Sequence, residues 1–71
     1  MPLTMLTPGK EAIIRECRAS EATRKFLEGL GLVPGTPVTV ISEMDGNLII
    51  KVKEARVALS KGVAGQVYIR V

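Results

Sequence analysis

Apolar and polar residues alternate along much of this chain, which is the pattern of strands that bury one face. The clearest example is residues 48–53, where Leu48, Ile50 and Val52 alternate with more polar positions. Comparable runs predict four further strands, over residues 12–17, 36–42, 57–59 and 67–71. In the last of these runs, Val71 is expected to face inward. The pattern therefore predicts five strands.

Glycine, proline and asparagine mark the turns between these strands. Residues 45–47 (Asp-Gly-Asn) are typical of a tight β-hairpin. The Pro-Gly pairs at 8–9 and 34–35 predict two more turns, and the second fits a type II turn, since proline fixes φ and glycine supplies a positive φ. Residues 54–56 and 61–66 predict short reversals.

One helix is expected at about residues 20–31. Ser20 is a favourable N-cap, and Gly31 can adopt the left-handed conformation that ends a helix. Four apolar side chains recur at helical spacing and are expected to form one buried face: Ala22, Phe26, Leu27 and Leu30. Two i,i+4 ion pairs are expected on the other side, Glu21 with Lys25 and Arg24 with Glu28.

A lone helix among short strands, in a chain of 71 residues, predicts a mainly β fold: a small closed barrel of five strands with one inserted helix. This length favours a single domain over residues 1–71. The interior is expected to be aliphatic, because apolar residues make up 46% of the chain and only Phe26 and Tyr68 are aromatic.

The composition argues against several functions. Two aromatic residues cannot pave a groove for proline-rich peptides or stack successive bases of a single strand. The net charge is +3, but the basic residues are scattered, so no nucleic-acid partner is expected. A cluster of Lys51, Lys53, Arg56 and Lys61 could touch nucleic-acid phosphates, although a solvated sheet edge explains it better.

Reactive side chains are scarce. The chain has no histidine, and its one cysteine, Cys17, has no partner for a disulfide or a catalytic pair, so the protein is not expected to be an enzyme. We expect no catalytic residue, no cofactor-binding residue and no metal ligand. The seven carboxylates are isolated in sequence, although a weak divalent-metal site shared between chains or with a partner stays open.

Protein recognition is the function that remains. The helix and the turn after it combine charged and apolar residues that suit a docking patch, predicted to comprise Arg24, Lys25, Glu28, Leu32, Val33 and Pro34. Leu32 and Val33 fit a core role equally well. Open strand edges also favour a homo-oligomer.

The N-terminal residues lack the layout of a signal peptide, and no apolar run reaches the roughly 18–20 residues of a membrane span. A single cysteine suits a reducing compartment. A cytoplasmic location is therefore expected.

The chain resembles the ferrous-iron transport protein A (FeoA) family over nearly its whole length. The resemblance is carried by the order and spacing of several segments: 2–4 with 8–10, 30–36, 38–40, 46–53, 56–59 and 64–71. It implies an SH3-like barrel and an accessory role in bacterial ferrous iron uptake. The implied partner is the cytoplasmic domain of a membrane iron transporter, which carries a guanine-nucleotide-binding domain and would hold the protein peripherally at the inner membrane. An alternative is a regulatory SH3-like module of a metal-dependent repressor system, or a weak nucleic-acid binder.

Overall fold

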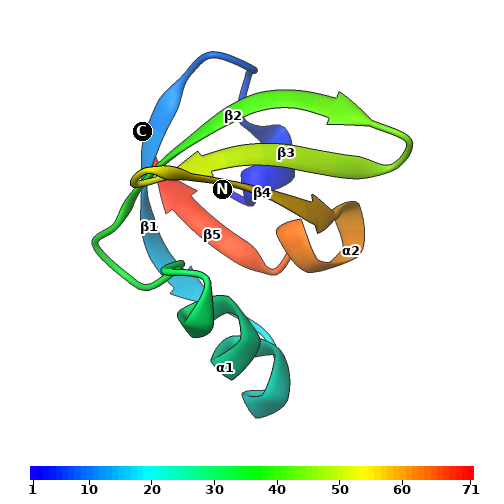
Figure 1. The fold of residues 1–71 in the computed structure, drawn as a ribbon. Helices are drawn as coiled ribbons and strands as arrows, with labels where there is room; N and C mark the ends of the chain where they lie inside the picture. Colours follow the sequence, from blue (N-terminus) through cyan, green and yellow to red (C-terminus); the bar gives the residue numbers. More distant parts are fainter.

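A computed structural model describes residues 1–71. Five antiparallel strands form one sheet in the order β4-β3-β2-β1-β5, which curls into a small barrel (Figure 1). The strands are β1 (Glu11–Cys17), β2 (Pro37–Met44), β3 (Asn47–Val52), β4 (Ala55–Ser60) and β5 (Val67–Arg70). The predicted mainly β fold of five strands is confirmed.

The predicted inserted helix is α1 (Glu21–Gly29), and its start at the Ser20 cap is confirmed. Two short elements accompany it. A 3₁₀ turn, η1 (Leu3–Met5), precedes the sheet, and the expected reversal before the last strand contains a four-residue helix, α2 (Lys61–Ala64). No helix in the protein has the length and apolar character needed to cross a bilayer.

The core is aliphatic, as expected, and consists of fifteen buried side chains: ten come from the five strands and the others from η1, α1, α2 and the loops. On β1 the adjacent isoleucines divide: Ile14 is buried with Ala12, and Ile13 is only half-buried on the outer face. The expectation for Val71 is wrong. The pairing of β5 with β1 ends at Arg70, so the inward–outward alternation does not continue to Val71, which is 77% exposed.

Both hairpins are two-residue turns. Asp45 and Gly46 have φ values of 51° and 80°, as the predicted hairpin requires. The reversal expected at residues 54–56 is wrong, since the turn residues are Lys53 and Glu54, and β4 already begins at Ala55. The sequence did not indicate this turn because Lys53, at φ 56°, adopts a conformation that lysine rarely takes.

The two Pro-Gly turns fasten the loops to the sheet. In each turn the residue after glycine donates its N–H to the residue before proline, and the glycine has φ near +90°. The N–H of Gly35 donates to the carbonyl of Ile14 at 2.7 Å, and the N–H of Gly9 donates to the carbonyl of Val40 at 2.7 Å. The type II turn predicted at residues 34–35 is confirmed, and it is bonded to β1.

The two edges of the sheet differ. The outer edge of β5 is covered by the start of the chain, where Ile69 N–H donates to Met1 C=O at 2.8 Å and Pro2 bridges Tyr68. The outer edge of β4 has no such cover, because β4 pairs only with β3. One edge of the barrel therefore stays open.

Candidate functional site

Helix α1 projects from one end of the barrel (Figure 1). Its first turn is capped by Ser20, whose Oγ accepts the N–H of Thr23 at 3.2 Å. Its last turn closes as a Schellman motif: Leu32 N–H donates to Leu27 C=O and Gly31 N–H to Glu28 C=O, both at 2.9 Å. Leu27 and Leu32 are fully buried, so the carboxyl-terminal end of the helix is the end anchored to the core.

Gly31 allows the helix to end in this Schellman motif, and replacing it tests how much its left-handed conformation contributes to stability. Gly31 has φ +88°, and an added Cβ would lie 3.6 Å from Val52 Cγ1, which is ordinary contact. We therefore expect Gly31→Ala to destabilise the protein by about 1–2 kcal/mol through backbone strain alone. Gly29→Ala is the control, since Gly29 lies in the helix with open space around it and should gain about 0.5–1 kcal/mol. Urea unfolding of both variants measures the difference, and equal stabilities would contradict it.

The face of α1 that contacts the barrel is narrower than the sequence predicts. Leu27 is buried and Leu30 packs against the core, but Ala22 is exposed and Phe26 is 56% exposed. The predicted four-residue apolar face is therefore wrong at two positions. Residues on a helix are 100° apart, so the line through Thr23, Leu27 and Leu30 can face the barrel while Phe26 lies on an open flank.

A hollow of about 270 Å³ lies beside the other flank of α1. The side chains around it come from the end of β1, from the helix and from the Pro-Gly turn: Glu16, Cys17, Arg24, Glu28, Leu32 and Pro34. It carries two carboxylates, one guanidinium and a thiol, which is a surface for recognition by charge and shape.

Four of the six residues predicted to bind a partner gather here, namely Arg24, Glu28, Leu32 and Pro34. Leu32 is fully buried, so the core role that the sequence left open applies to it, and Val33 is half-buried. Lys25 lies away from the hollow and pairs with Glu21 at 3.5 Å, as expected. The second expected pair, Arg24 with Glu28, does not form. Partner binding by the six residues stays a prediction.

Cys17 is suited to packing and poorly suited to nucleophilic chemistry. Burial raises the pKa of its thiol, and the carboxylates of Glu28 and Glu16 raise it further, while Arg24 opposes them. The thiol also approaches the carbonyl of Leu32, with 3.8 Å between sulfur and oxygen. The neutral thiol is therefore the form that the hollow favours.

This raised pKa predicts slow alkylation of Cys17. At pH 8 iodoacetamide should modify the folded protein more slowly than the protein in urea, because less thiolate is present. Glu28→Gln removes an influence that raises the pKa and should accelerate the reaction, whereas Arg24→Gln should slow it. The rate measured from pH 7 to 10 tests the sign, and faster alkylation of the folded protein would contradict the assignment.

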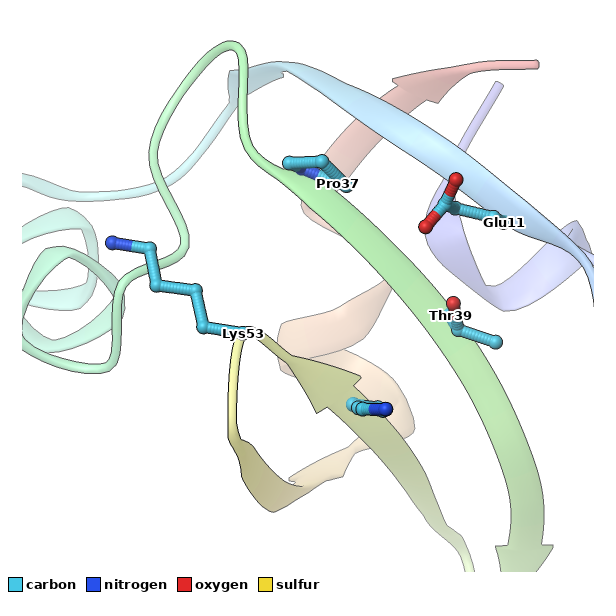
Figure 2. Close-up of a pocket in the computed structure, with 5 residues that line it drawn as sticks. Glu11, Pro37, Thr39 and Lys53 are labelled. Atoms are coloured by element: carbon cyan, nitrogen blue, oxygen red, sulfur yellow. The ribbon is translucent and has the colours of Figure 1, made fainter.

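A second hollow, of about 260 Å³, lies on the outer face of the sheet (Figure 2). Its walls are Glu11 of β1, Pro37 and Thr39 of β2, Lys51 of β3, and Lys53 just after β3. The strand register explains this gathering, since Glu11 lies opposite Thr39 and Thr39 lies opposite Lys51. Lys51 and Lys53 could be grouped from the sequence, but nothing in the sequence indicated that Glu11, from another strand, lies in the same hollow.

No three Cys, Asp or Glu side chains come close enough together to hold a metal ion.

The family model for the FeoA domain matches residues 1–71. The chain belongs to the FeoA domain family. No curated protein sequence matches it significantly.

Solved structures agree with this assignment. A crystal structure of an iron uptake regulatory protein, FeoA, is 32% identical, with a TM-score of 0.90 over 99% of this chain and 95% of that one. The FeoA of Stenotrophomonas maltophilia, crystallised with zinc, is 25% identical, with a TM-score of 0.87 over 99% of this chain and 89% of that one. That protein is described as a prokaryotic SH3 domain protein, so the SH3-like barrel implied by the resemblance is confirmed.

A similar fold occurs in larger proteins. A manganese-dependent transcriptional repressor in complex with manganese matches 99% of this chain with a TM-score of 0.90, but at 14% identity and over 35% of its own length. At that identity the likeness shows the barrel fold alone.

Proposed function

We propose that this protein is a non-enzymatic accessory factor of bacterial ferrous iron uptake, which binds the cytoplasmic domain of a membrane iron transporter. The Stenotrophomonas relative is itself described as a suggested activating factor of ferrous iron transport. The observation that carries the proposal is the exposed Phe26 on a projecting helix, in a chain that belongs to the FeoA domain family.

Helix α1 is the element that fits a partner best. One flank carries Arg24 and Glu28, the opposite flank carries Phe26, and Lys25 lies between them on the side away from the barrel. A helix exposed over so wide an arc suits insertion into a groove, where a partner covers both flanks at once. Aromatic and arginine side chains contribute most of the binding energy at such contacts.

The side chains of this protein support recognition rather than catalysis. The chain has no histidine to act as a base near neutral pH, and the one thiol is held in its neutral form. The proposed role needs no bound metal, and a weak divalent-metal site assembled with a second chain or with the transporter stays compatible with it. The protein would act in the cytoplasm, at the inner membrane only through its partner.

Direct association tests this function. The purified protein is titrated into the isolated cytoplasmic domain of the transporter, with and without guanine nucleotide, and binding is followed by calorimetry. Saturable binding with one protein per transporter domain is expected. Absence of association in both nucleotide states, with a folded protein and a folded domain, would overturn the proposal.

A further inference from the structure

The open edge of β4 carries backbone hydrogen-bonding groups that no other strand uses. It is a surface separate from α1, and its role is additional to the proposed function. The two-residue turn at Lys53 and Glu54 makes Val52 and Ala55 the closing pair of the hairpin. Hydrogen-bonded and non-hydrogen-bonded pairs then alternate, so Val57 and Leu59 direct their backbone groups to β3. The β2–β3 hairpin leads to the same assignment. Its closing hydrogen-bonded pair is Met44 with Asn47, so the backbone groups of the next residue, Leu48, point away from β2 and toward β4.

The backbone groups of Arg56 and Ala58 consequently point outward from the sheet. No backbone hydrogen bond joins residues 55–59 to any part of the chain other than β3. Ala58 is exposed to solvent. The opposite edge of the sheet is covered by Met1 and Pro2, which makes β4 the edge that can accept another strand.

The charge along this edge selects the occupant. Arg56 lies directly across from Lys51 in the β3–β4 register, and like charges in that position repel. Lys53 and the carboxylate of Glu54 follow in the adjoining turn, so Arg56 is the one charged side chain within β4 itself. None of these three cations belongs to any of the three ion pairs in the protein. A carboxylate opposite Arg56 would relieve the repulsion.

We propose that β4 binds an extended acidic segment of a partner protein, which adds to the sheet as a sixth strand. On the outer face of the sheet, the side chains of this segment would include a carboxylate opposite Arg56. On the inner face they would be apolar and would pack beside Val57, which is half-buried. Backbone hydrogen bonds supply the affinity, and the contact with Arg56 makes the edge prefer an acidic segment to a basic one. A second copy of this chain is a poorer occupant because it would bring another Arg56–Lys51 pair to the same edge.

The test uses the whole ¹⁵N-labelled protein and a blocked peptide of alternating valine and glutamate. Its saturating addition should slow amide hydrogen exchange at Arg56 and Ala58 at least about tenfold, because their N–H groups gain acceptors. The matched peptide of alternating valine and lysine should have no such effect. A glutamate peptide with N-methyl groups on the edge-facing amides should also fail, and this control leaves the protein unchanged.

Two protein variants distinguish the contribution of backbone hydrogen bonds to peptide binding from the contribution of charge. Ala58→Pro removes one outward N–H without removing a bond to β3, and it should abolish peptide binding. Arg56→Glu should reverse the preference, so that the lysine peptide protects Ala58 and the glutamate peptide does not. This second variant keeps the test decisive if proline disturbs the strand, since the introduced carboxylate would face Lys51 and favour the hairpin.

Three results would overturn the proposal. The first is no protection by the glutamate peptide at millimolar concentration. The second is equal protection by both peptides, which would remove the role of charge. The third is protection of Arg56 and Ala58 without peptide that grows with protein concentration, because a second copy would then occupy the edge. None of these results depends on transporter binding by α1.

Discussion

Leu27→Ala is expected to remove most of the stability of this protein at 25 °C. Leu27 is fully buried, and it joins α1 to the barrel through the core and through the Schellman hydrogen bond from Leu32. Replacing a buried leucine by alanine costs about 2–5 kcal/mol, and a core of this size supplies only about 3–5 kcal/mol in total. Urea and thermal unfolding followed by circular dichroism measure the loss.

The neighbouring residue is the control for that experiment. Phe26→Ala removes a larger side chain from the same helix, yet it should change stability by less than about 0.5 kcal/mol, because the ring is 56% exposed. A comparable loss in both variants would mean that Phe26 packs on the barrel and that the helix is oriented differently.

Phe26→Ala is also expected to weaken binding to the cytoplasmic domain of the transporter by about 30-fold or more. An aromatic side chain buried at the centre of an interface typically contributes about 2 kcal/mol or more, and 1.4 kcal/mol corresponds to a tenfold change in Kd. Calorimetry with the folded variant gives the affinity, and circular dichroism verifies that its structure is intact.

Met44→Ala is the matched control for binding. Met44 is 61% exposed at the end of β2, beside the Asp45–Gly46 turn, and so it tests whether any exposed apolar side chain matters. Its replacement should leave Kd unchanged. If Met44→Ala weakens binding and Phe26→Ala does not, the docking surface is at the hairpin and α1 has no part in it.

The elements with strong local signals could be predicted from the sequence. Ser20 and Gly31 define the limits of α1 by capping chemistry, and the alternation of Leu48, Ile50 and Val52 places β3 and its buried face. The Pro-Gly pair at 34–35 gives the turn type because few other residues fit its dihedral angles. In each case, one or two residues determine the local backbone.

The predictions from sequence are wrong where contacts between distant parts of the chain determine the local structure. Helical spacing alone could not distinguish Phe26 from Leu27, because burial depends on which line of the helix the barrel touches. The turn at Lys53 lacks the glycine or asparagine that normally marks such a turn, so its position depends on the pairing of β3 with β4. The open edge of β4 likewise follows from strand order, which no local pattern in the sequence specifies.

The attachment of α1 by its carboxyl-terminal end has an evolutionary consequence. Substitutions at Ala22, Lys25 and Phe26 alter exposed positions, so they cost the barrel little stability and selection on folding barely constrains them. Leu27 has no such freedom. The outward side of the helix can therefore diverge between lineages while the barrel beneath it stays the same.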